Sequence, residues 1–243
     1  MVLVLDSTLR YDQEETMDLI AAIRARRSIR VFKPDPIPKE ILQELLDVSR
    51  WAPSGGNVQP WHFDVLGGEL LPKVAARLMG KAKTWDGHDY VNTKPDLPRT
   101  GPYSKLLIPR QQSLKALQDA IRYPPGTKDL EAKQFEQREH MLRFFDAPSA
   151  VVVCTDDRGP NSIVSIGGVT QTICLAALTY GLGTCIMGVP VLWPEIFREF
   201  LDIPKDRVIV TSIAIGYPDL RAPINTFPRP REPLDKLVEW YGL

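Results

Sequence analysis

An arginine-rich run near the start of the chain has the composition of an anion-binding site. Arg26, Arg27, Ser28 and Arg30 occur within five residues, RRSIR, where a predicted helix gives way to an extended segment. Guanidinium groups offer paired, permanently charged donors that match phosphate oxygens, and a serine hydroxyl adds another donor. The run therefore predicts a phosphate site, although a solvated basic helix end would have the same composition.

A second polar run, PSGGNVQPW, occupies residues 53–61. Its glycines allow backbone amides to approach a ligand closely, and Asn57 and Gln59 each carry a donor and an acceptor that suit the edge of a heterocycle. The run is neither a P-loop, because no GKS/T follows, nor a Rossmann fingerprint, because GxGxxG is absent. An ordinary helix-to-strand loop is the alternative.

Two later segments carry further candidate contacts. The run GLGTCIMG at residues 181–188 places short apolar residues between glycines, so that the backbone N–H groups near Met187 and Gly188 can face a ligand. In the tail, PRPREP at residues 228–233 is stiffened by proline and presents Arg229 and Arg231. Each segment also has a purely structural explanation. For residues 181–188 it is a helix cap followed by a buried strand, and for residues 228–233 it is a basic surface stretch.

The elements that must position these residues follow from periodicity. We expect strands at 61–66, 150–155 and 207–216, and helices at 16–27, 41–48, 69–80, about 111–122, 128–145, 162–180 and 234–240. The helix at 162–180 is almost uncharged, so it must be covered on most sides, within the domain or at a subunit interface. Residues 81–145 are expected to form an insertion or lid. No repeat or linker divides the chain, which predicts one domain over residues 1–243 with a C-terminal arm at about 218–243.

The composition excludes several classes of function. Thirty basic residues balance thirty acidic ones among 243, so neither nucleic acid nor a membrane is an expected partner. The three cysteines lack any metal-ligand spacing, which predicts buried thiols, no metal and a reducing, cytoplasmic location. The histidines at positions 62, 88 and 140 have no pattern that indicates catalysis.

Taken in order and spacing, RRSIR, PSGGNVQPW, GLGTCIMG, IAIGYP and PREPLDKLV resemble the nitroreductase family of FMN enzymes. The resemblance implies an α+β fold: a three-layer α/β/α arrangement with a mixed, mainly antiparallel sheet, in an intertwined homodimer with FMN at the interface. It departs from the family at Gln171, near a position where the family often has asparagine, and the insertion matches no specific subfamily.

By the same resemblance, Arg26, Ser28 and the nearby Arg27 bind the FMN phosphate, Arg30 faces the flavin O2/N1 edge, and Met187 and Gly188 present backbone toward flavin N5. The isoalloxazine and ribityl groups are lined by Pro53, Ser54, Gly55, Asn57 and Gln59, and Arg229 or Arg231 closes on the phosphate. We expect Trp85, Tyr90 and Tyr103 of the insertion to contact substrate.

The implied activity is reduction of small electron-poor compounds, such as nitroaromatics and quinones, by NAD(P)H with ping-pong kinetics and no catalytic residue beyond the flavin. Arg30 and Gly188 would tune that flavin. Four alternatives remain open at this point: a reductive dehalogenase of the iodotyrosine-deiodinase type, an enzyme that fragments reduced flavin with oxygen, a flavin-binding protein without turnover, and a nucleic-acid-binding module. Zero net charge argues against the last.

Overall fold

An antiparallel sheet forms the centre of the computed structural model, which describes residues 18–85, 93–98 and 103–242. Its strands are β1 (Trp61–Gly67), β2 (Ser149–Thr155), β3 (Gly183–Met187) and β4 (Val208–Gly216). The α-helices are α1 (Leu19–Ala25), α2 (Lys39–Ser49), α3 (Leu70–Ala82), α4 (Ile108–Arg122), α5 (Leu130–Leu142), α6 (Pro160–Ala176), α7 (Pro194–Phe200) and α8 (Pro223–Thr226). The 3-10 turns are η1 (Gly55–Asn57), η2 (Phe144–Asp146), η3 (Ala177–Tyr180), η4 (Pro190–Leu192) and η5 (Leu234–Lys236).

The strand order β1-β2-β4-β3 places β2 and β4 inside the sheet, and this explains their unbroken apolar sequences. Val151 of β2 pairs with Val65 of β1 on one side and with Ile213 of β4 on the other. All pairs between these strands are antiparallel; the parallel element recorded among the described residues is a single bridge between Ser28 and Thr184. The sheet is thus mainly antiparallel, as predicted, with this bridge as its mixed component.

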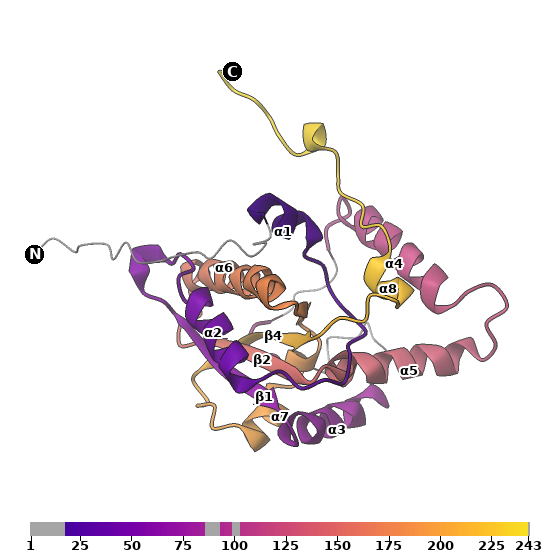
Figure 1. Cartoon of the computed structure of the whole chain (residues 1–243), viewed down its shortest axis with the longest axis horizontal. Coiled ribbons are helices and arrows are strands. Elements are labelled where there is room, and N and C mark those ends of the chain that lie inside the picture. The colour runs from indigo at the N-terminus through magenta and orange to yellow at the C-terminus, as the bar shows by residue number, and fades with distance from the viewer. Residues whose placement is uncertain (1–17, 86–92, 99–102, 243) are drawn as a thin grey trace, which may run out of the picture.

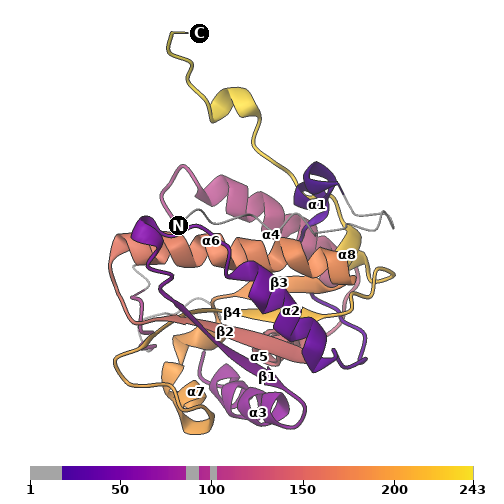
Figure 2. The same ribbon diagram turned by 60° about the vertical axis from the view of Figure 1, so that its left-hand side comes forward.

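Helices cover both faces of the sheet and produce three layers (Figure 1). Alternate residues of β2 point to opposite faces. Val151 and Val153 join the core cluster under α2 and α6, whereas Val152 and Cys154 join the cluster that includes α3 and α7. Figure 2 shows α2 and α6 on one side of the sheet and α3 and α7 on the other.

Helix α6 confirms the long, nearly uncharged helix that the sequence predicts. It begins at Pro160, continues into η3, and ends at Gly181, whose φ of 66° is the left-handed conformation that glycine adopts without strain. The segment Pro160–Tyr180 has the length and apolar composition of a membrane span, but its inner face packs in the core, as expected of a central helix in a globular protein. Its outer face is open: the side chain of Val164 is 75% exposed.

Two helix predictions need correction. The helix expected at 16–27 spans Leu19–Ala25, and Asp18 caps it by accepting a hydrogen bond of 3.0 Å from the Ala21 N–H. The terminal helix expected at 234–240 is wrong. Only the 3-10 turn Leu234–Lys236 forms, because the arm that carries it extends away from the domain and no packing holds a helix there (Figure 2).

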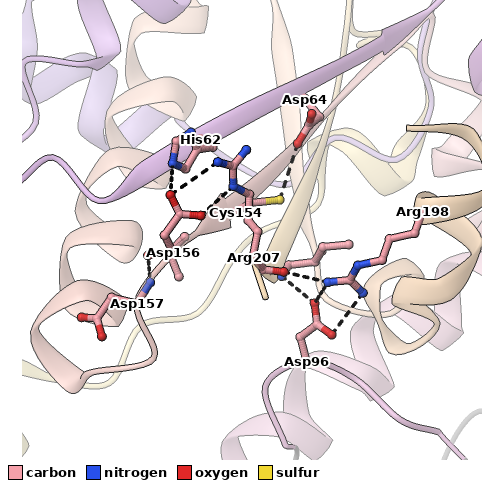
Figure 3. Close-up of polar contacts among 10 residues, drawn as sticks. His62, Asp64, Asp96, Cys154, Asp156, Asp157, Arg198 and Arg207 are labelled. Atoms are coloured by element: carbon pink, nitrogen blue, oxygen red, sulfur yellow. Dashed lines mark hydrogen bonds and ion pairs between the residues drawn. The ribbon is translucent and has the colours of Figure 1, made fainter. Parts of the chain in front are cut away.

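The described parts of the predicted insertion are attached to the domain at several points. Asp96 accepts hydrogen bonds from Arg198 of α7, at 2.7 Å and 3.2 Å, and from the Ile209 N–H of β4 at 2.8 Å (Figure 3). Helix α5 packs against α3, and Phe135 of α5 lies against the core. These parts therefore form a wall that is built into the domain.

Candidate anion-binding site

A cavity of about 550 Å³ gathers the first arginine run and the arginines of the tail. Its size lies in the range of small-molecule and cofactor sites. One side consists of the segment after α1, a second of the tail after α8, and a third of one face of α4. Its lining residues are Arg26, Arg27, Ser28, Arg30, Pro109, Arg110, Ser113, Leu114, Gln118, Phe227, Arg229, Pro230, Arg231 and Glu232.

The backbone of the RRSIR segment is held in place by the edge of the sheet. Ser28 bridges to Thr184 of β3, and the Ile29 N–H donates to the Thr184 carbonyl at 2.9 Å. This close approach needs a glycine beside Thr184, because a Cβ at Gly183 would lie 2.6 Å from Ile29 Cγ1. The sheet edge thus fixes the direction of Ser28 and Arg30.

The C-terminal tail is fastened to the same segment. The Arg27 Nη2 donates to the Phe227 carbonyl at 2.7 Å, and its guanidinium lies 5.3 Å from the centre of the Phe227 ring. Arg229 donates to the carbonyls of Arg26 and of Arg24, the latter at 2.6 Å. Arg229 therefore reaches the cavity together with Arg26 and Arg27.

The positive charges that line this cavity favour the binding of an anion. Among the described residues, no carboxylate lies within ion-pair distance of Arg26, Arg27, Arg30, Arg229 or Arg231. The Nε atoms of Arg26 and Arg27 are buried and make no hydrogen bond in the described part of the chain. Burial, followed by the positive charges of Arg229 and Arg30, lowers the pKa of Arg27. Since buried donors and like charges are costly without a partner, the cavity suits a multiply charged anion such as a phosphate.

The PSGGN run lies at a different cavity of about 340 Å³, which is lined by Pro53, Ser54, Gly55, Asn161, Val164, Ser165 and Gly168. The loop holds a strained shape, because Asn57 and Gln59 have φ values of 54° and 47°. The Ser54 hydroxyl stabilises it by accepting a hydrogen bond from the Gln59 N–H at 3.0 Å. A single chain therefore does not line one cavity with both of the predicted ligand-binding runs.

The predicted contacts of Met187 and Gly188 lie at the end of β3 and line neither of these cavities. Met187 is buried, and its carbonyl accepts a hydrogen bond of 2.9 Å from the Ser212 hydroxyl of β4. This bond fixes the backbone where β3 ends.

The predicted substrate residues separate into different environments. Trp85 is 5% exposed and packs edge-on to Trp193, with ring centres 5.6 Å apart. Contrary to expectation, it is a core residue, because the end of α3 turns its ring toward α7. Tyr103 is 60% exposed and stays available for a ligand. Tyr90 lies outside the described residues.

Sequence reasoning missed the wall that α4 contributes. A helix was expected near 111–122, but its cavity face was not identified because its leucines and arginines alternate with polar residues, without a strong apolar stripe. Asn225 was also missed. It is fully buried, and nothing in the local sequence signals its three hydrogen bonds, to the Arg30 N–H and to the carbonyls of Val31 and Asp219.

A second polar cluster, at the ends of β1 and β2, has a structural role. Asp156 accepts hydrogen bonds from His62 Nε2 at 2.6 Å and Arg207 Nε at 2.7 Å (Figure 3). The Arg207 hydrogen bond is the main cause of the lowered pKa of Asp156. These charges are paired with one another, and the described residues contain no group of three His, Cys, Asp or Glu side chains that could hold a metal.

Comparison with known proteins identifies the family of this chain. The Nitroreductase family model matches residues 23–217. A 4-nitrobenzoate reductase of Nocardioides sp. (strain LMS-CY) is 32% identical over 90% of this chain and 87% of the relative, and one of Pseudomonas putida is 29% identical over 93% and 97%. The FMN and NADPH-dependent nitroreductase NfnB of sphigopyxis sp. strain HMH superposes with a TM-score of 0.84 at 25% identity, covering 93% of this chain and all of that one. The chain belongs to the nitroreductase family.

Proposed function

We propose that this protein is an FMN-dependent oxidoreductase that uses NAD(P)H to reduce nitroaromatics, quinones and similar small electron-poor compounds. The observation that carries the proposal is the arginine cavity, whose buried and unpaired Nε atoms of Arg26 and Arg27 fit the phosphate of FMN. The protein works in the cytoplasm, where its buried cysteines stay reduced.

Different residues on the cavity wall contact different groups of FMN. Arg26, Arg27 and Ser28 bind the phosphate, and Arg229 and Arg231 close on it from the tail. When bound, FMN supplies the chemistry by accepting a hydride from NAD(P)H and passing it to the acceptor. Arg30 lies beyond the phosphate residues, where its charge favours the negative charge that develops at the N1/O2 edge. Gly188, directly after β3, would present its backbone toward flavin N5.

A second copy of the chain completes the site. Pro53, Ser54 and Gly55 line a separate cavity, so these loop residues, with Asn57 and Gln59 of the same loop, reach the FMN of the other subunit. The surface beside this loop is apolar: Trp51 is 80% exposed and Val164 is 75% exposed. The exposed residues Leu234, Leu237, Trp240 and Tyr241 of the extended arm are covered by the same partner. An intertwined homodimer therefore completes the FMN site and covers the exposed apolar surface.

Nicotinamide and acceptor occupy the same place in succession, which gives ping-pong kinetics. Tyr103 belongs to this shared site, and we retain Tyr90 as a second contact. The solved NfnB relative is NADPH-dependent, so NADPH is the reductant to test first.

The test is an absorbance spectrum of the purified protein followed by titration under anaerobic conditions. We expect bound flavin that loses its yellow colour on addition of NADPH and regains it when a nitroarene is added. A protein that binds FMN but is not bleached by NADPH or NADH would be a flavin-binding protein without turnover. A protein that binds no FMN would refute the proposal entirely.

A further inference from the structure

One face of helix α4 forms a wall of the arginine cavity and continues past it. Arg110, Ser113, Leu114 and Gln118 line the cavity at the spacing of one helix face. Arg122 follows Gln118 by one turn, and its Nη1 donates to Gln118 Oε1 at 3.5 Å. Arg122 also lines the neighbouring cavity of about 370 Å³, together with Tyr123 and His140. The guanidinium of Arg122 therefore lies between the two cavities.

The two arginines of this face differ in their electrostatic surroundings. Arg110 is neutralised by Glu232, with Nε and Oε2 3.1 Å apart. Within the described ranges no carboxylate lies within ion-pair distance of Arg122, and the nearby Asp119 is bound to Lys115. Burial, and then the positive charge of Arg30, lowers the pKa of Arg122. Arg122 is thus a partly buried cation that lies near another cation. It makes no ion pair in the described part of the chain, although Asp119 acts on its charge and Glu136 and Asp146 line the same cavity.

The position of Arg122 relative to Arg30 separates it from the phosphate end of the cavity. Under the proposed function, Arg26, Arg27, Arg229 and Arg231 surround the phosphate, and Arg30 faces the flavin ring. The hydrogen bond from Arg122 to Gln118 attaches it to the wall of the arginine cavity, near enough to Arg30 for the two charges to repel each other, so under the proposed function it lies toward the ring end. Leu114 offers apolar contact on the same helix face.

We propose that Arg122 is a specificity-determining residue that binds the carboxylate of an acidic nitroarene of the nitrobenzoate class. A guanidinium pairs with a carboxylate through two parallel hydrogen bonds, which would orient the ring as well as attract it. The inference rests on the proposed function, which supplies the flavin and the hydride. Two relatives of this chain are 4-nitrobenzoate reductases, and acceptors of that class carry the required anion.

The test compares 4-nitrobenzoate with 4-nitrobenzamide, a neutral acceptor of nearly the same shape, in the FMN-loaded enzyme with saturating NADPH. For Arg122→Gln we expect kcat/KM for 4-nitrobenzoate to fall roughly 10- to 100-fold, the loss that follows removal of a charged hydrogen bond, through a higher KM. The value for 4-nitrobenzamide should change less than about threefold, within the scatter of single-site effects. Arg122→Lys should recover part of the loss because it restores the charge.

Lys73→Gln is the control, since it removes one exposed positive charge on α3, away from both cavities, and should leave the ratio of the two acceptors unchanged. A parallel fall with both acceptors, or weaker FMN binding in Arg122→Gln, would overturn the inference and assign Arg122 to the flavin. A wild-type enzyme that reduces 4-nitrobenzamide but not 4-nitrobenzoate would also overturn it while supporting the proposed function. A wild-type protein that reduces neither would refute the function itself.

Discussion

The buried side-chain oxygen of Asn225 accepts a hydrogen bond of 2.7 Å from the backbone N–H of Arg30. The same amide group donates to the carbonyls of Val31 and Asp219, at 2.7 Å and 2.9 Å. One side chain thereby fastens the arginine segment at the start of the domain to the tail that carries Arg229. The two halves of the anion cavity are held together through this residue.

Replacing Asn225 should affect stability and ligand binding together. Asn225→Ala leaves a partly buried N–H and two partly buried carbonyls without this partner, which should cost about 2–4 kcal/mol in the free energy of unfolding. Urea denaturation measures that loss, and titration with FMN should show weaker binding because Arg30 and Arg229 are no longer aligned. Normal stability with normal FMN affinity would show that the clamp is dispensable.

Trp85 and Tyr103 should respond oppositely to truncation. Trp85→Ala opens a void beside Trp193 and should lower the free energy of unfolding by about 3–5 kcal/mol. Tyr103→Ala, at an exposed position, should change it by less than about 0.5 kcal/mol but alter the KM for acceptors. Urea denaturation and steady-state kinetics check the pair. A Trp85→Ala variant with unchanged stability and altered acceptor preference would show that Trp85 contacts substrate instead of stabilising the core.

The exposed face of α6 should be the place where dimerisation is most sensitive. Val164→Glu puts a charge into the proposed interface, so light scattering should show a shift from dimer toward monomer with loss of bound FMN. Lys73→Glu on α3, across the sheet, introduces the same acid and should remain dimeric. If Val164→Glu stays a dimer with full FMN content, the interface lies elsewhere.

His140 should make the fold sensitive to mild acid. Burial lowers the pKa of His140, an effect that Asp146, 3.3 Å away, only partly offsets and that Arg143 reinforces. The unfolded chain, in which the histidine pKa is about 6.5, therefore takes up the proton first as pH falls. Stability should be highest above that pH and decline as pH falls toward the folded-state pKa. His140→Gln should flatten this part of the urea midpoint profile between pH 7.5 and 5.5, and an unchanged slope would exclude His140 as the cause.

Continuous apolar sequence made the centre of the fold predictable. The strands β2 and β4 and the helix α6 are buried strongly enough that their residue types alone indicate them. The clustering of Arg26, Arg27, Ser28 and Arg30 was predictable for a different reason, because these residues are adjacent in the sequence. Their meeting with Arg229 and Arg231 rested on resemblance to a family.

Contacts between distant or weakly patterned segments could not be predicted. Trp85 was assigned to a pocket because aromatic residues in an irregular segment look alike, whether they pack on Trp193 or face a ligand. Helix α4 has no buried residue, so its pattern did not reveal which face lines the cavity. The arm at 234–240 lacks a packing partner among the residues that the structure describes, so helical spacing alone did not produce a helix.

The central claim, that the arginine cavity binds the phosphate of FMN, is tested most directly by comparing FMN with riboflavin, which lacks the phosphate. We predict that apoprotein binds FMN much more tightly than riboflavin, and that Arg26→Gln weakens FMN binding about 10- to 100-fold, as expected for loss of a charge-assisted hydrogen bond. The same substitution should leave riboflavin binding unchanged. Equal affinity for the two flavins, or an equal loss for both in Arg26→Gln, would contradict the account.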